Sequence, residues 1–249
     1  MQQMRILTTL FLALFTMGQI GAAGSEYATK EWWNQFWETS QGWGQPNERV
    51  STLLSRMDGS KGTITVVDIG AGNGRNSVLA LMKLFEGCYP KSHFVVHCMD
   101  TSEKALQGLV NNTLPQWLQI VTHNIDVNTL TSDSLPAADL LLLYGILEYV
   151  KEVNLSRVLH LASQALNFGG YLVAVSLVKG EGALEIAGET TRPADFYTQC
   201  FEGLKEMDFL DRPVMSQRPD RHDLGKGYPE DHLHYVYRTV LVKKYERLN

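Results

Sequence analysis

The amino-acid sequence predicts a single α/β domain built on a mostly parallel sheet with helices on both faces. Three observations predict it. Short β-branched or apolar runs alternate along the chain with segments of helical periodicity, the order typical of parallel sheets. The 249 residues suit one α/β domain of ordinary size. Hydrophobic residues make up 44% of the chain and charged residues 20%, which indicates a globular composition.

Each element follows from its local pattern. Strands are predicted over residues 63–69, 93–99, 118–123, 139–143 and 171–177, and over 233–242 as one long strand or a bent pair. Helices are predicted over 76–85, 102–110, 155–166 and 195–207, with Ser102 as an N-cap. Two segments, 179–192 and 211–231, are interpreted as long irregular insertions, which are often functional in compact domains.

Residues 26–58 are predicted to form a helical cap before the first strand. Trp32, Trp33, Phe36 and Trp37 recur at the spacing of one helix face, and a second helix is expected over 50–57. Such an aromatic helix is able to close over a ligand, and it is equally able to pack against the sheet. Residues 26–249 are therefore expected to form one domain with this cap at its N-terminal end.

The first 25 residues differ in character from the rest. One basic residue precedes an apolar run, and small residues follow at 21–23. This order is typical of a secretory signal peptide, and the run is too short and too interrupted for a stable membrane span. We expect a signal peptide or an N-terminal hydrophobic segment. The protein would be secreted or enter the secretory pathway in the first case and be cytoplasmic otherwise.

Charge and cysteine content narrow the function classes. The formal net charge is −5, without the basic surplus of a protein that binds phosphate backbones, so a nucleic-acid substrate is disfavoured. The three cysteines, Cys88, Cys98 and Cys200, are widely spaced and contain no C-x-x-C pair. This spacing predicts neither a disulfide framework nor a metal site.

A glycine-rich turn follows the first strand, in the run VVDIGAGNG. Gly70, Gly72 and Gly74 occupy alternate positions, which allows a ligand to lie against the backbone. A dinucleotide site would need the G-x-G-x-x-G spacing, which is absent, so a nicotinamide-dependent oxidoreductase is the less favoured reading. Asp68 beside the turn suits a ligand with an amino group and a sulfonium, and would repel a pyrophosphate.

Polar side chains also follow the next three strands. Asp100 ends the second strand, where an acid is able to accept hydrogen bonds from ribose hydroxyls. Asn124 and Asp126 follow the third strand, within reach of an adenine amino group, and Tyr144 follows the fourth. The carboxyl ends of parallel strands meet at one edge, so these side chains are expected to border one pocket.

These motifs resemble those of class I S-adenosylmethionine-dependent methyltransferases. The resemblance rests on VVDIGAGNG, Asp100, Asn124 with Asp126, ADLLLLYGILEYV and LNFGGYL, and covers about residues 60–178. It implies a Rossmann-like seven-stranded sheet with an antiparallel last strand, and S-adenosyl-L-methionine as cofactor. The cofactor-binding residues that it implies are Asp68, Gly70, Gly72, Gly74, Asp100, Asn124, Asp126 and Tyr144.

The acceptor is less specified, because methyl transfer needs mainly alignment, exclusion of water and sometimes a general base. The candidates for catalysis are Tyr144, Glu148, His232 and His234. We expect an N or O nucleophile on a protein or small molecule. The N-P-P-Y sequence is absent after the fourth strand, which disfavours an amide or exocyclic base amine.

The Trp-rich start and the C-terminal tail are loosely similar to those of protein N-terminal α-amine methyltransferases. The apparent signal peptide and the GAG turn instead resemble those of protein-histidine N-methyltransferases. After the fifth strand, however, the sequence reads SLVKGEG and lacks the Asp-Asn pair expected for α-amine methylation. No catalytic residue is therefore transferred from either group. The alternative function is a catalytically inactive protein that uses the methyltransferase fold for binding.

Overall fold

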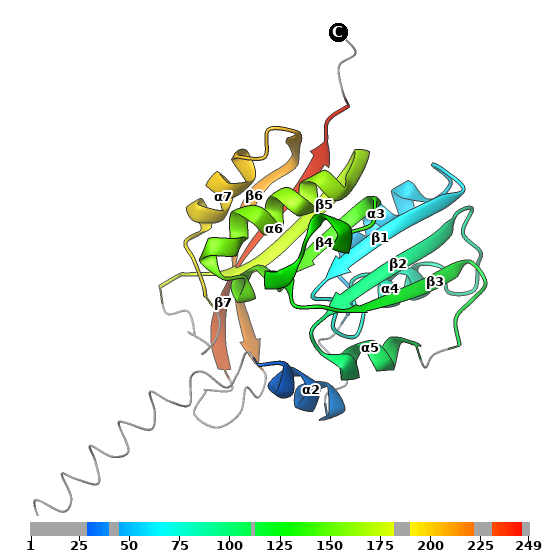
Figure 1. The fold of residues 1–249 in the computed structure, drawn as a ribbon, viewed down its shortest axis with the longest axis horizontal. Helices are drawn as coiled ribbons and strands as arrows, with labels where there is room; N and C mark the ends of the chain where they lie inside the picture. Colours follow the sequence, from blue (N-terminus) through cyan, green and yellow to red (C-terminus); the bar gives the residue numbers. More distant parts are fainter. Residues whose placement is uncertain (1–28, 40–44, 111–112, 182–189, 222–230, 246–249) are drawn as a thin grey trace, which may run out of the picture.

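A seven-stranded sheet in the order β3-β2-β1-β4-β5-β7-β6 forms the centre of the protein (Figure 1). The computed structural model describes residues 29–39, 45–110, 113–181, 190–221 and 231–245. Strands β1 to β5 pair in parallel, and β7 runs antiparallel between β5 and β6. The predicted Rossmann-like sheet with an antiparallel last strand is confirmed.

The strands and helices alternate along the chain as the sequence predicts. The strands are β1 (Thr63–Ile69), β2 (His93–Asp100), β3 (Leu118–Asn124), β4 (Ala138–Tyr144), β5 (Leu166–Val178), β6 (Met207–Arg221) and β7 (Asp231–Lys243). The helices are α2 (Lys30–Thr39), α3 (Glu48–Met57), α4 (Val78–Leu84), α5 (Glu103–Val110), α6 (Glu152–Ala165) and α7 (Ala194–Glu202). The described residues also form the 3-10 turns η2 (Val127–Thr129), η3 (Ser132–Ser134) and η4 (Leu147–Tyr149).

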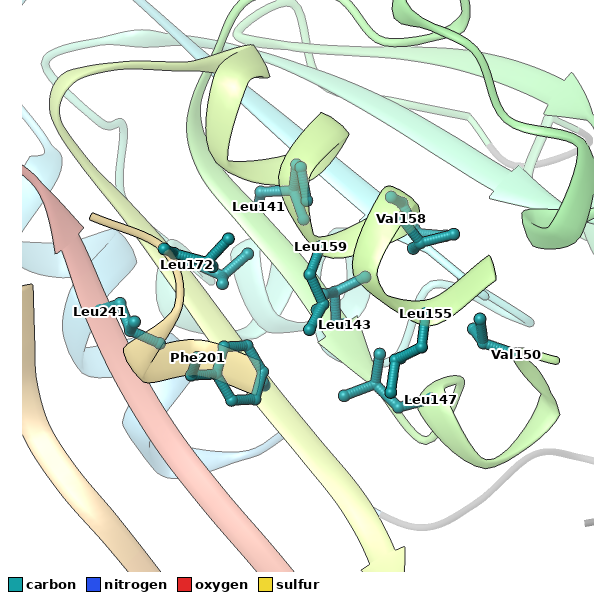
Figure 2. Close-up of a cluster of buried hydrophobic side chains, with 14 of the residues drawn as sticks. Leu141, Leu143, Leu147, Val150, Leu155, Val158, Leu159, Leu172, Phe201 and Leu241 are labelled. Carbon is teal, nitrogen blue, oxygen red and sulfur yellow. The ribbon is translucent and has the colours of Figure 1, made fainter. Parts of the chain in front are cut away.

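Two hydrophobic layers hold helices against the two faces of the sheet. Val66 of β1 packs in the layer with α3, α4 and α5, and its neighbour Val67 packs in the opposite layer with α6 and α7. Figure 2 shows part of the second layer, where Leu155 and Leu159 of α6 lie beside Leu143 of β4. Strands buried on both faces are hydrophobic at successive positions, which explains the continuous apolar run of β4.

The strand order reverses between β1 and β4, where connections lead away in opposite directions. In open α/β sheets, ligands bind outside the carboxyl ends of the strands at such a switch point. Asp68, Asp100 and Tyr144 lie at the carboxyl ends of β1, β2 and β4. The topology therefore brings side chains from distant parts of the sequence to one edge.

The prediction of an irregular insertion over 211–231 is wrong for its first half. Strand β6 extends to Arg221 and pairs with β7 along its length. Its register shifts around Asp211 and Pro213, and Asp211 forms an ion pair with Arg49 of α3. Charged residues, a proline and bulges are tolerated in an edge strand, whose outer side has no partner, so the sequence there lacks the usual apolar pattern.

The boundaries of α7 and β5 also differ clearly from prediction. The helix expected over 195–207 ends at Glu202, because Gly203 caps it and Met207 already begins β6. Strand β5 begins at Leu166 instead of residue 171, and the predicted double-glycine turn is an irregularity within it. Gly169 has a φ of +76°, a conformation that suits glycine at such a bulge.

Several predictions concern residues beyond the described ranges. The predicted signal peptide or hydrophobic segment over 1–25 lies outside them, as do residues 182–189 of the first insertion and 222–230 of the second. Among the helices that the structure describes, none is long and apolar enough to cross a membrane.

Candidate functional site at the carboxyl edge of the sheet

The glycine turn after β1 has a backbone that only glycine adopts readily. Gly70, Gly72 and Gly74 have φ angles of +75°, +53° and +70°. A Cβ atom at Gly70 would lie 2.8 Å from Ile146, and one at Gly72 would lie 2.5 Å from the ring of Trp37. Both the dihedral angles and the side chains packed against the turn therefore require glycine at these positions.

Asp68 is the single acid of β1, directly before this turn, and is only 3% exposed. Ser77, just before α4, donates a 2.6 Å hydrogen bond to its Oδ2. Burial raises the pKa of Asp68 to about 6, although the Ser77 hydroxyl opposes this; Asp100 raises the pKa further and Arg75 lowers it. A cationic group beside this carboxylate would lower its pKa and favour the charged form.

Asp100 ends β2 and faces the same turn. Its Oδ2 accepts a 2.8 Å hydrogen bond from the Gly72 N–H, and its Oδ1 accepts one of 2.8 Å from the Ser102 N–H. Burial raises its pKa, and the backbone N–H groups of Ser102, Gly72 and Thr101 oppose the increase. The backbone thus fixes the orientation of the carboxylate.

Asn124 ends β3 and Asp126 follows it, but only Asn124 is turned toward Asp100. The Asn124 amide donates hydrogen bonds to the carbonyls of Asp100 and Thr101, at 3.2 and 2.8 Å, and its Oδ1 accepts one from Lys30 of α2. Asp126 instead caps η2, where its Oδ1 accepts hydrogen bonds from Asn128. Asn124 therefore lies beside Asp100 at the candidate site, whereas Asp126 caps a 3-10 turn.

Arg75 also lies at the candidate site, although the sequence pattern did not single it out. Its guanidinium lies over the ring of Tyr144, 5.3 Å from the centroid, and it acts electrostatically on Asp68. The Tyr144 hydroxyl accepts a 3.4 Å hydrogen bond from Asn47, the N-cap of α3. The sequence signal for Arg75 is its position directly after Gly74, because the glycine turn places that position at the carboxyl edge of the sheet.

Helix α2 lies across this edge, beside α5 (Figure 1). Besides the contact of Trp37 with Gly72, Asn34 accepts a 2.8 Å hydrogen bond from the Ser102 hydroxyl. Lys30 contacts both Glu103 and Asn124. The predicted aromatic helix therefore covers the glycine turn and the segments that follow β2 and β3.

Glu148 belongs to a buried polar network that joins η4 to β5 and α7. Ser176 of β5 donates a 2.9 Å hydrogen bond to Glu148 Oε2, and the Tyr197 hydroxyl lies 3.2 Å from Ser176 Oγ. Arg192 donates to the Tyr197 hydroxyl at 3.4 Å and to the carbonyls of Leu147 and Val150. Burial raises the pKa of Tyr197. This network fixes η4 directly after the end of β4.

The two candidate histidines near the C-terminus both belong to β7. His234 is buried and pairs in register with Arg218 of β6. It lies one residue before Tyr235, which is the first residue of β7 to pair with β5. His232 lies in the same strand, and its side chain falls outside the described part of the chain. Among the described residues, no group of three or more His, Cys, Asp or Glu side chains is arranged to hold a metal ion.

Comparison with known proteins shows the fold. No family model matches the sequence, and no curated protein matches it. TehB from Haemophilus influenzae has a TM-score of 0.59 and 15% identity, with 86% of this chain and 67% of TehB covered. A putative methyltransferase from Bacillus halodurans has a TM-score of 0.54 and 12% identity, with 80% of this chain and 100% of that chain covered.

A third similar structure is the complex of the Haloferax volcanii Trm112 methyltransferase activator with a putative methyltransferase. Its TM-score is 0.52 at 14% identity, with 80% of this chain and 90% of that chain covered. Together with the strand order, these similarities show that the chain has the class I methyltransferase fold. Identities this low carry no information on the substrate.

Proposed function

We propose that this protein is an S-adenosylmethionine-dependent methyltransferase that binds its cofactor at the carboxyl ends of β1 and β2. One observation carries the proposal. Two buried or half-buried acids, Asp68 and Asp100, flank a turn of three positive-φ glycines that leaves no space for side chains. The fold alone would accommodate other ligands. The two carboxylates beside the glycine turn favour a ligand with hydroxyl and ammonium groups over one with a pyrophosphate.

The residues present fit the nucleoside part of the cofactor. Asp100 is held by backbone N–H groups, and its carboxylate suits the hydroxyl groups of a ribose as hydrogen-bond donors. Asn124 carries both a donor and an acceptor, which suits the edge of an adenine ring. Its present partners, the Asp100 and Thr101 carbonyls and Lys30, hold it at this edge.

The charges fit the amino-acid part of the cofactor. Asp68 offers a carboxylate for an ammonium group, and Arg75 offers a guanidinium for a carboxylate. The two side chains act on one another electrostatically at the turn, as a site for a zwitterion requires. The bound cofactor supplies the activated methyl group, and the protein supplies its orientation.

Tyr144 is the proposed contact for the methyl acceptor. Its ring lies beneath Arg75 and its hydroxyl accepts a hydrogen bond from Asn47, so the phenol proton at Oη is available to an acceptor oxygen or nitrogen. Helix α2 would exclude water from the same edge, which strengthens electrostatic contacts there. We propose an N or O nucleophile of a protein or small molecule as acceptor.

The test is calorimetric titration of the full-length chain with S-adenosylmethionine, S-adenosylhomocysteine and NAD. Binding of the first two but not of NAD is expected. Asp100→Ala should weaken both by roughly tenfold to a hundredfold, because hydrogen bonds to a charged group contribute about 1.5–3 kcal/mol. Asp133→Ala, which removes an exposed acid in η3, is the matched control and should bind as the wild type does.

A screen of protein and small-molecule acceptors with labelled cofactor then tests turnover. Transfer that Tyr144→Phe reduces by about tenfold or more, with cofactor affinity retained, would support the role of Tyr144. Cofactor binding without any transfer would favour the inactive binding protein. A folded chain that binds neither sulfur ligand would refute the proposed function.

A further inference from the structure

The side-chain amide of Asn47 holds the hydroxyl of Tyr144 in one hydrogen-bond direction. Asn47 is the N-cap of α3, and its Oδ1 accepts hydrogen bonds from the Arg49 and Val50 N–H groups at 2.9 and 3.4 Å. Its backbone N–H donates to Asn76 Oδ1 at 3.0 Å. Because the oxygen end of the amide caps the helix, the Nδ2 end faces Tyr144 and donates to its hydroxyl at 3.4 Å.

The Tyr144 hydroxyl is therefore a hydrogen-bond donor toward the site. The Asn47 amide nitrogen is a donor only, so the phenol oxygen accepts and its own proton points elsewhere. Among the described residues, Asn47 is the one hydrogen-bond partner of this hydroxyl. The guanidinium of Arg75 lies over the ring, and its positive charge draws electron density from the phenol, which strengthens the O–H as a donor. A group that meets Tyr144 must therefore offer a lone pair.

This requirement separates oxygen acceptors from nitrogen acceptors. A neutral amine has one lone pair, which forms the new bond to the methyl group, so the amine is unable to accept the phenol proton at the same time. An oxygen nucleophile has a lone pair for each purpose. An alcohol or an ammonium group must in addition lose a proton to a general base.

The candidate base that follows β4 is enclosed. Glu148 is 3% exposed, and its Oε2 accepts the hydrogen bond from Ser176 inside the buried network. In the part of the chain that the structure describes, no acid or histidine contacts the Tyr144 hydroxyl. A carboxylate acceptor needs no base, because it is already ionised at neutral pH. The site therefore favours a carboxylate over an alcohol.

We propose that the methyl acceptor is a carboxylate whose oxygen accepts a hydrogen bond from Tyr144 Oη, with Asn47 as the residue that positions this donor. The inference rests on the proposed function and narrows its acceptor to an ionised carboxyl group. The acceptor oxygen bonds the methyl carbon through one lone pair, and the carbon–sulfur bond breaks with its electrons left on sulfur. The negative charge of the carboxylate and the positive charge of the methyl donor cancel, and no proton is transferred.

Nuclear magnetic resonance of the full-length chain, labelled with ¹³C at tyrosine Cζ, tests the direction of this hydrogen bond. Tyr144→Phe identifies the resonance of Tyr144. With S-adenosylhomocysteine bound, formate should move this resonance downfield in a saturable manner, because donation to an anion polarises the phenol O–H. Methylammonium, a cation of similar size, should leave the resonance unchanged.

Asn47→Asp should reverse the hydrogen bond and keep the helix cap, because Asp and Asn are equally good N-caps. The new carboxylate accepts the Tyr144 proton, so the resonance should lie downfield without formate, and the response to formate should be lost. Gln119→Glu makes the same amide-to-acid change at an exposed position of β3. This matched control should respond as the wild type does. Retained binding of S-adenosylhomocysteine in calorimetry establishes that each variant is folded.

The product of the acceptor screen gives a second, chemical test. A carboxyl methyl ester releases its label as methanol in mild base, whereas N-methyl and ether products keep theirs. A base-stable label, or a Tyr144 resonance that responds to methylammonium and not to formate, would overturn the proposal. A folded chain that binds no S-adenosylhomocysteine would instead refute the proposed function on which this inference rests.

Discussion

At the scale of single residues, Asp68 is a buried acid whose pKa is raised by that burial and lowered by Arg75. Its folded pKa of about 6 lies above the ordinary value of 3.8, so the native state binds a proton more tightly than the unfolded chain does. The stability that this proton contributes is complete below about pH 4 and is lost as the pH rises through about 6. At neutral pH the ionised carboxylate therefore opposes folding until a cationic ligand group meets it.

Asp68→Asn should reverse this penalty. At pH 8, without ligand, the variant is expected to be more stable than the wild type by up to about 3 kcal/mol, because the shift is about two units. The advantage should shrink below pH 6 and vanish near pH 4. Urea denaturation across this pH range measures it. An unchanged pH dependence in Asp68→Asn would contradict the assignment, and the same variant should bind S-adenosylmethionine more weakly.

Gly72→Ala tests the turn itself. The left-handed conformation costs an alanine about 1–2 kcal/mol, and its Cβ would contact the Trp37 ring at 2.5 Å. We expect lower thermal stability and cofactor affinity reduced by about tenfold, since the turn or α2 must shift. Gly62→Ala is the control, because its Cβ meets nothing within 4 Å. Equal behaviour of the two variants would contradict the strained turn.

At the scale of elements, α2 depends on a few contacts with the edge it covers. The Lys30–Glu103 and Lys104–Glu38 ion pairs are largely exposed, so each contributes little. The packing of Trp37 on the glycine turn and the Asn34–Ser102 hydrogen bond are the more specific contacts. The helix is therefore expected to detach more easily than the sheet unfolds.

Trp37→Ala should expose α2 without unfolding the domain. Amide hydrogen exchange, followed by mass spectrometry, is expected to become faster in Lys30–Thr39 while α3 and the sheet keep their protection. Trp32→Ala, which removes a ring stacked on Phe36 of the same helix, is the matched control and should change exchange less. Faster exchange throughout the chain would instead indicate that Trp37 stabilises the whole fold.

At the scale of the whole molecule, two apolar layers on opposite faces of one sheet hold the site edge in place. Leu159 of α6 is 1% exposed and lies in the layer that Figure 2 shows. Leu159→Ala should reduce the free energy of unfolding by about 2–5 kcal/mol, through lost burial and the remaining cavity.

Val153 offers the matched control for this variant, because it lies on the same helix and is 88% exposed. Val153→Ala should change the free energy of unfolding by less than about 0.5 kcal/mol. Chemical denaturation of both variants measures the difference. Similar losses in the two would contradict the position of α6 over the sheet.

Much of this architecture follows from the sequence, because it rests on local requirements. Strands buried on both faces need apolar runs, a tight turn against a ligand needs glycine, and acids at strand ends recur at predictable positions. These requirements led to the five parallel strands, and they place Asp68, Asp100 and the glycine turn at the candidate site. Strand β6 escaped prediction because an edge strand has no such requirement on its outer side.

The tertiary structure decided which side chains meet. It joined Arg75 to Tyr144 and Lys30 to Asn124, and it placed Glu148 in a network with Ser176 and Arg192. It also turned Asp126 toward its own 3-10 turn and paired His97 with His123. These contacts join residues far apart in the chain or depend on strand register, and neither is encoded in the local pattern of polar and apolar residues.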